Sequence, residues 1–228
     1  VYSFYVLYAD IDKFDPTKYK LEKDKLNIMD KWVLSRLNSL VKKVDENLEV
    51  YKITESSRII QEFVDDLSNW YVRRSRERFW GSEMTQDKVN AFMTLYTVLE
   101  TMTKICAPFV PFMAEAIYQN VVRTVDKNAS ESVHLCEFPK VAPEYIDEDM
   151  IYNMDKVLKI VTLGRACRNT ANLKNRQPLA GLYVKAGREL PEIYKEVVLD
   201  ELNIKELYYF EDANEFVGYK LKPDRKVA

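Results

Sequence analysis

Histidine and glycine are scarce in this chain, and each shortage excludes a class of function. His134 is the only histidine among 228 residues, and a zinc site, a His-based catalytic triad or a Glu-x-x-His di-iron bundle each needs more than that. Neither phosphate-binding glycine pattern, Gly-x-x-x-x-Gly-Lys or Gly-x-Gly-x-x-Gly, occurs. We therefore expect no catalytic residue, no metal site and no cofactor in this chain, and we expect His134 to be a packed or surface side chain.

Cysteine and long apolar runs are also in short supply. Cys106, Cys136 and Cys167 are an odd number and widely spaced, which argues against a disulfide framework or a zinc ribbon and predicts small core residues in a reducing, cytoplasmic setting. No apolar run approaches the roughly 18 residues that cross a membrane, and no signal peptide is visible. Because the chain opens on Val1 rather than Met, inside an aromatic run, we interpret it as an excised fragment.

Net charge is almost absent, at −2. Any RNA binding must therefore come from local patches, because bulk charge supplies no attraction. Residues 164–179 carry four cations and no carboxylate, whereas residues 189–215 carry nine acids against two lysines. This asymmetry is typical of a protein with one face for an anion and other faces kept soluble.

The spacing of apolar residues predicts a mainly α-helical fold. Steps of three and four residues mark amphipathic helices, and five glycines are too few for many tight turns. The expected helices span about 28–49, 54–79 (with its N-cap at Thr54–Ser57), 87–105, 112–124 and 149–172.

These elements predict three regions. Residues 1–125 form a helical bundle, and residues 126–148 form a connector in which 132–135 is a short extended piece. Residues 149–228 form a helix followed by a small α+β subdomain. That subdomain consists of strands at 182–184 and 204–210 with a short helix at 191–201 between them.

An arginine-rich stretch at 69–80 is the first candidate binding surface. Arginine presents a rigid fork of donors that suits phosphate oxygens, and its flat face stacks on bases. We expect Arg73, Arg74, Arg76 and Arg78 to contact RNA, and Trp70 and Trp80 to be packed. Helical geometry places residues 73, 76 and 77 on one face near 80, and residues 74 and 78 on another. At least one arginine is therefore expected to pair with a carboxylate, such as Glu77 or one on a neighbouring helix. A helix with an aromatic core face and a solvated basic face remains the alternative.

The second candidate surface contains Arg165, Arg168, Lys174 and Arg176. Arg165 and Arg168 are three residues apart and share a helical face. With no acid nearby in the sequence, they are less easily explained as internal ion pairs, and we expect them to contact RNA. Arg36 is a weaker candidate, because it could instead bridge two helices.

Several segments, in order along the chain, resemble the C-terminal half of class I aminoacyl-tRNA synthetases. The matching segments are Asp30–Asn38, Asn69–Trp80, Ala107–Phe112, Ser132–Leu135 with Phe138-Pro139, Lys174–Leu179 and Glu201–Lys205. The run of arginines resembles the isoleucine branch in particular, because the valine and leucine branches usually lack it. Phe138 departs from the Trp that is common at this place. The lack of zinc-ligand cysteines near the end fits the eukaryote-like branch, or a chain that stops before such a module.

The resemblance implies an anticodon-binding domain of the isoleucyl-tRNA synthetase family, with isoleucine tRNA and the catalytic domain of the same polypeptide as partners and a monomeric state. The family's His-x-Gly-His and Lys-Met-Ser-Lys-Ser signatures are absent. Charging of tRNA with ATP and magnesium would therefore belong to the parent enzyme, and this chain alone would be inactive. The equivalent domain of a valine, leucine or methionine synthetase and a helical protein-interaction module remain as alternatives.

Overall fold

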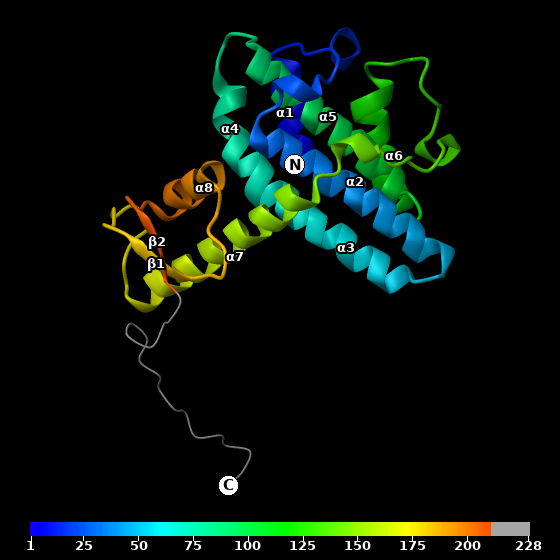
Figure 1. The fold of residues 1–228 in the computed structure, drawn as a ribbon. Helices are drawn as coiled ribbons and strands as arrows, with labels where there is room; N and C mark the ends of the chain where they lie inside the picture. The colour runs from blue at the N-terminus through cyan, green and yellow to red at the C-terminus, as the bar shows by residue number, and fades with distance from the viewer. Residues whose placement is uncertain (211–228) are drawn as a thin grey trace. The chain divides into compact units, whose positions relative to one another are not determined.

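The computed structural model of the chain describes residues 1–210, which fall into two compact units. The first unit is Val1–Glu148, and the second is Asp149–Ala228, described as far as Phe210. The predicted region 149–228 and the acidic stretch 189–215 both extend outside the described residues. Helices dominate the described residues, as the apolar spacing predicts (Figure 1).

The first unit is built from helices joined by short segments (Figure 1). Its helices are α1 (Tyr2–Ile11), α2 (Ile28–Glu49), α3 (Ile53–Asp66), α4 (Arg73–Trp80), α5 (Gln86–Cys106) and α6 (Pro111–Tyr118). α2 packs against both α3 and α5, and α5 also packs against α1, α4 and α6.

The two long helices α2 and α5 form where the sequence predicts them. The Asn27 side chain accepts a hydrogen bond from the Asp30 amide at 2.9 Å and caps α2. The Thr85 hydroxyl caps α5 in the same way. Trp32 of α2 and Phe92 of α5 are fully buried, so the apolar stripes of both helices form the core of the unit.

The predicted second helix is interrupted. A π-helical turn, Leu67–Val72, joins α3 to α4, and a similar turn, Gln119–Arg123, extends α6. The expected N-cap at Thr54–Ser57 is wrong, because α3 already begins at Ile53 without a side-chain cap. A π-turn changes the phase of the residues that follow it, which matters for the arginines of α4.

α1 is not predicted by the sequence analysis. It forms from the opening aromatic run, where the Phe4 ring lies 5.0 Å from the Phe79 ring in an edge-to-face arrangement, and Tyr5 is buried near Phe92. Aromatic residues lie on several sides of this helix, so it has no separate polar face. An amphipathic helix is recognised from sequence by the alternation of an apolar and a polar face, so α1 gives no such signal.

The connector 126–148 belongs to the first unit. The Asn38 side chain of α2 accepts a hydrogen bond from the Ala142 amide at 2.8 Å. The Ser35 hydroxyl of α2 accepts one from the Asp147 amide, also at 2.8 Å. These two bonds hold the segment along α2 although it contains no long helix.

The piece of the connector that was expected to be extended is a 3₁₀ turn, Val133–Leu135. Glu115 of α6 holds it by accepting hydrogen bonds from the Ser132 hydroxyl at 2.9 Å and the Val133 amide at 2.8 Å. Burial would raise the pKa of Glu115, but the hydrogen bonds from Gln119, Val133 and Ser132 outweigh it and lower that pKa. The charged carboxylate is thus the form that fastens the turn.

The second unit has a helix and a β-α-β segment. Its elements are α7 (Glu148–Thr170), which starts one residue before the unit boundary, β1 (Leu182–Lys185), α8 (Glu192–Leu202) and β2 (Leu207–Phe210). The strands pair in parallel, with Leu182 opposite Leu207, and α8 provides the crossover that parallel strands require. The elements that the sequence predicts in residues 149–210 are therefore present.

α7 and α8 approach closely at Gly164. A Cβ atom at this position would lie 2.5 Å from Cδ1 of Leu202, a side chain that is itself buried. Any larger residue at position 164 would therefore force the buried Leu202 side chain to move. Among residues 1–210, none of the helices combines the length and apolar character that a membrane-spanning segment needs.

Candidate nucleic-acid interface

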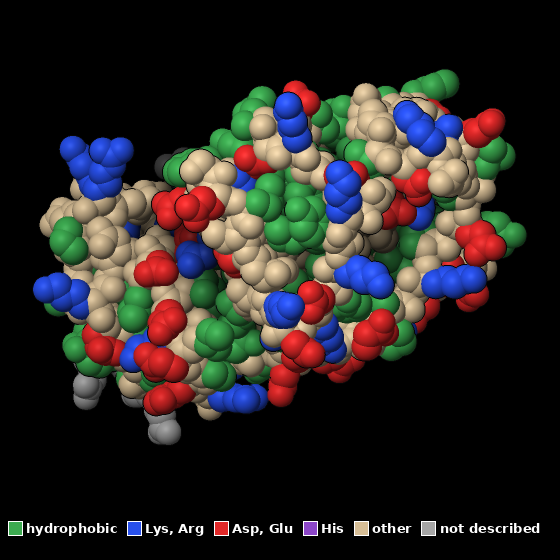
Figure 2. Space-filling view, turned by 90° about the horizontal axis from the view of Figure 1, so that it is seen from above, with side chains coloured by type: hydrophobic (Ala, Val, Ile, Leu, Met, Phe, Trp, Pro, Cys, Tyr) green, Lys and Arg blue, Asp and Glu red, His purple; other side chains and the backbone are tan. Residues whose placement is uncertain are grey.

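Charge is mixed on the face of the molecule that Figure 2 shows. On the face seen in Figure 2, lysine and arginine side chains are scattered among aspartate and glutamate rather than gathered into one basic area. The local contacts of each cation therefore decide whether it can reach an external phosphate.

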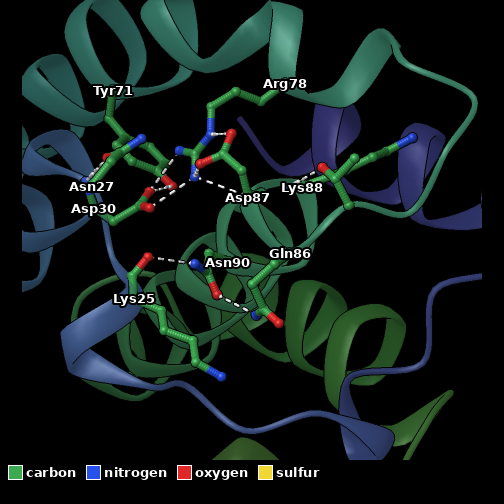
Figure 3. A network of polar contacts seen from close by, with 10 residues as sticks. Lys25, Asn27, Asp30, Tyr71, Arg78, Gln86, Asp87, Lys88 and Asn90 are labelled. Carbon is green, nitrogen blue, oxygen red and sulfur yellow. Dashed lines mark hydrogen bonds and ion pairs between the residues drawn. The ribbon is translucent and has the colours of Figure 1, made fainter.

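Arg78 of α4 lies at the centre of a polar network that joins three helices (Figure 3). Its terminal nitrogens donate to both carboxylate oxygens of Asp30 on α2, each at 2.8 Å. Its Nε and Nη2 donate to the carboxylate of Asp87 on α5, also at 2.8 Å. Asp30 is fully buried, and the Tyr71 hydroxyl donates a further hydrogen bond to it at 2.7 Å.

The electrostatics of this network keep Arg78 inside the fold. Burial would lower the pKa of Arg78, but the hydrogen bond to Asp30, the charge of Asp30 and the hydrogen bond to Asp87 outweigh it and raise that pKa. Burial, and then the charge of Asp30, raises the pKa of Tyr71 well above its usual value. The expectation that at least one arginine pairs with a carboxylate on a neighbouring helix is met by Arg78. Its expected contact with RNA is not supported, because all three of its nitrogens already donate within the fold.

The other three arginines of α4 are placed differently. Arg73 is half-buried, with Nε donating to the carbonyl of Asn69 at 2.8 Å and the guanidinium 5.8 Å from the Trp70 ring centroid. Arg74 is also half-buried. Arg76 is exposed and makes no hydrogen bond or ion pair within residues 1–210. It is the arginine of this group that is best placed for an external anion.

The two tryptophans beside these arginines differ in burial. Trp70 is 9% exposed, as expected of a packed residue, whereas Trp80 is 60% exposed and the expectation of packing is wrong. Trp80 lies one helical turn after Arg76, so both side chains share the outward face of α4.

Arg36 bridges helices rather than reaching outward. Its Nη2 lies 2.6 Å from a carboxylate oxygen of Asp66, which connects α2 to α3. The alternative given for Arg36 in the sequence analysis is thus the one that the structure supports.

Two arginines of the second candidate surface also have internal partners. Arg165 of α7 forms an ion pair with Glu201 of α8. The two residues are 36 positions apart in the sequence, and the fold brings them together. The partner that Arg165 lacks among its sequence neighbours is therefore supplied by an acid from a distant part of the chain. Arg168 is 3% exposed, so a direct phosphate contact is not supported for it either.

Arg168 instead organises a loop. Its Nη1 donates to the carbonyls of Lys174 and Gln177, both at 3.0 Å, and its Nη2 to the carbonyls of Leu202 and Asn203. A buried guanidinium that donates to several carbonyls satisfies the polar atoms of a turn and of a helix end together.

Asn203 completes the support of this loop. Its side-chain amide donates to the carbonyls of Asn175 and Arg176, at 3.3 and 3.0 Å. Arg168 and Asn203 together therefore hold the four consecutive carbonyls of residues 174–177. The side chains of Lys174 and Arg176 remain exposed, so two predicted cations are presented on a fixed backbone.

The role of Asn203 was missed by the sequence analysis. Asn203 follows α8 with φ 48°, in the left-handed region, where asparagine often ends a helix. An asparagine two residues after the end of the predicted helix 191–201 was the available signal. No sequence signal predicted the hydrogen bonds from the Asn203 side chain to the carbonyls of Asn175 and Arg176.

The histidine, cysteine and acidic side chains of residues 1–210 are the groups that could support catalysis or bind a metal ion. No group of three or more His, Cys, Asp or Glu side chains in residues 1–210 is arranged to hold a metal ion. His134 is exposed. Cys167 is exposed, contrary to the expected core position, whereas burial raises the pKa of the partly buried Cys106 to about 11.

Comparison with known proteins gives consistent matches. Residues 30–184 match the sequence profile of a family described as "Anticodon-binding domain of tRNA ligase". The chain is similar to an "Isoleucine--tRNA ligase" of Clostridium novyi, with 52% identity over 227 residues, covering 100% of the chain and 22% of that protein. It is 47% identical to an "Isoleucine--tRNA ligase" of Dehalococcoides mccartyi, covering 91% of the chain and 21% of that protein. It is 44% identical to an "Isoleucine--tRNA ligase 2" of Bacillus cereus, covering 100% and 22%. The chain thus spans about a fifth of the length of these relatives.

Proposed function

The chain belongs to the anticodon-binding domains of tRNA ligases, and from this membership we propose that it binds the anticodon stem and loop of isoleucine tRNA as part of an isoleucine–tRNA ligase. The isoleucine assignment is supported by the names of the relatives, at 44–52% identity. The parent enzyme would charge isoleucine tRNA with isoleucine, using ATP and magnesium in a catalytic domain of the same polypeptide. We further propose that it acts as a cytoplasmic monomer.

The observation that carries the proposal is the loop 174–177. Contacts to phosphates position a protein on RNA, and they require cations held where the backbone of the RNA passes. Lys174 and Arg176 meet this requirement, because Arg168 and Asn203 fix the carbonyls of the loop and leave both cations exposed. A fixed loop loses less conformational freedom on binding than a mobile one.

Arg76 supplies a candidate contact on the first unit. It is exposed on the outward face of α4, one helical turn before the exposed Trp80. This pairing suits an RNA loop, because arginine contacts phosphates and an aromatic ring accepts an unstacked base. We assign Arg73 and Arg74 a lesser part, since each is half-buried.

Binding across a salt series tests the proposal. The chain is titrated with an isoleucine tRNA transcript and with the same transcript carrying a valine, leucine or methionine anticodon. We expect tighter binding to the isoleucine anticodon and an affinity that falls steeply with salt. A folded chain that binds none of the four would refute RNA binding and favour a protein-interaction module. Tighter binding to the valine, leucine or methionine anticodon would instead assign the domain to the synthetase for that amino acid.

A double variant, Lys174→Gln with Arg176→Gln, tests the loop itself. Each lost phosphate contact should lower the slope of log affinity against log salt by about one, so we expect a decrease of about two. The control is Lys20→Gln with Lys42→Gln, which changes the net charge equally at two exposed lysines outside the loop. Equal effects of the two double variants would contradict a specific role of the loop.

A further inference from the structure

A groove in the second unit lies between α7 and a wall that is formed by the end of β1, the segment after it and Tyr209 of β2. It encloses about 450 Å³ and is lined on one side by Tyr152, Lys156 and Lys159 of α7, and on the other by Lys185, Arg188 and Tyr209. Its size is within the range of sites that hold a nucleotide-sized ligand. None of these residues belongs to the loop 174–177 or to the other cations that the sequence analysis singled out.

The charges of this groove are all of one sign. Four cations line it, and no carboxylate does so among the residues that the structure describes. None of the four pairs with a carboxylate within residues 1–210. Other cations of the same unit do pair, since Lys195 contacts Glu206 at 2.6 Å and Arg165 contacts Glu201. Four like charges around one hollow repel each other, and an anionic ligand would relieve that repulsion.

Aromatic rings are interleaved with these cations. The ring of Tyr152 is about half exposed, and the ammonium group of Lys156 lies 4.5 Å from its centroid. On the other wall, the Tyr209 hydroxyl accepts a hydrogen bond from the Leu190 amide at 3.1 Å. That bond fixes the end of the segment that carries Arg188.

The positions of the cations favour an extended ligand. Lys156 and Lys159 are three residues apart on α7 and so share one face of the helix. Lys185 and Arg188 belong to the opposite wall. Cations on both walls suit a chain of successive phosphates rather than a single small anion, and sequence-tolerant binding of unpaired strands uses this combination of a basic groove with stacking rings.

We propose that this groove binds an unpaired segment of RNA, with the four cations on its phosphates and the ring of Tyr152 against a base. The inference rests on the proposed function, because it takes tRNA as the ligand. It adds a contact site on the second unit that is separate from the loop 174–177.

The test uses the whole chain and the isoleucine tRNA transcript. The groove variant carries Lys156→Gln, Lys159→Gln, Lys185→Gln and Arg188→Gln. The matched control carries Lys20→Gln, Lys42→Gln, Lys140→Gln and Lys205→Gln, which removes four charges at exposed lysines elsewhere. Each phosphate contact on a single strand contributes about 0.7 to the salt slope. We therefore expect the slope of the groove variant to fall by about 2–3 and its affinity at about 0.1 M salt to fall at least tenfold, beyond the change in the control.

A second pair of variants tests the ring. Tyr152→Phe keeps an aromatic face and should bind as the native chain does, whereas Tyr152→Leu should lose about tenfold in affinity if a base stacks there. Circular dichroism and thermal unfolding verify that every variant is folded.

The outcomes separate this inference from the proposed function. If the native chain binds the transcript and the groove variant matches its control, the groove inference is overturned while the proposed function stands, and an acidic protein segment becomes the candidate ligand of the groove. If the folded native chain does not bind the transcript, both are overturned. A larger loss in the groove variant than in the control, with Tyr152→Phe binding normally, supports the groove as an RNA site.

Discussion

We predict that Arg78→Met destabilises the first unit by about 3–5 kcal/mol, the usual result of removing one partner from a buried ion pair. The substitution leaves the carboxylate of Asp30 fully buried, with only the Tyr71 hydroxyl donating to it among residues 1–210. The second pair, to Asp87, accounts for little of this, because the Asp87 side chain is 56% exposed and such pairs contribute about 1 kcal/mol or less.

A double-mutant cycle isolates the source of the loss. Asp30→Asn removes the buried charge but keeps an acceptor for Tyr71, so in that background Arg78→Met should cost less. We expect a coupling of up to about 3 kcal/mol between the two positions. The matched control is Arg58→Met, an exposed arginine of α3, which should change stability by less than about 0.5 kcal/mol.

Urea unfolding followed by tryptophan fluorescence measures these changes. All three tryptophans, Trp32, Trp70 and Trp80, lie in the first unit, so the signal reports that unit alone. A loss below about 1 kcal/mol for Arg78→Met would refute the reasoning. If Arg78→Met leaves stability unchanged but weakens tRNA binding, the reasoning is also refuted, because Arg78 would then contact RNA rather than stabilise the fold.

Three further predictions concern other sites. Gly164→Val should destabilise the second unit by at least about 1–3 kcal/mol through overpacking against Leu202; thermal unfolding checks this, and an unchanged or raised melting temperature would contradict it. Because the pKa of Glu115 is lower in the folded state, its stabilising contribution is present above the unfolded value of about 4.3 and is lost as the pH falls through the folded value. Glu115→Gln should therefore be less stable at neutral pH and lose less stability in acid, as urea midpoints at several pH values would reveal; parallel curves would argue against it. At pH 8, iodoacetamide should alkylate the exposed Cys167 well before Cys106, whose pKa is raised to about 11; mass spectrometry of timed samples decides, and the reverse order would disprove it.

Local sequence signals predicted the helices with one clear apolar stripe. α2 spans Ile28–Glu49 as predicted, because its apolar residues recur at regular steps of three and four. α1 could not be predicted in this way, because its aromatic residues leave no polar face. The π-turn Leu67–Val72 was also invisible, since it depends on how the surrounding helices pack.

The candidate site was harder to predict than the fold. The ion pair between Arg165 and Glu201 and the bonds from Arg168 to residues 174–177 join segments that are far apart in the sequence. Charge patterning counts neighbours along the chain, so it classified both arginines as free. The groove beside α7 went unnoticed for the same reason, because its two walls are brought together only by the fold.

The division of labour around the loop 174–177 has a consequence for how this domain can change. The shape of the loop is encoded by residues outside it, Arg168 and Asn203, which grip only its carbonyls. Every amino acid has a carbonyl, so the exposed side chains at 174–176 can be exchanged without altering the support beneath them. Natural or designed substitutions at 174–176 can thus change the ligand specificity of the loop while its backbone conformation stays the same. Substitutions at Arg168 or Asn203 would instead remove the hydrogen bonds that fix the backbone of the loop.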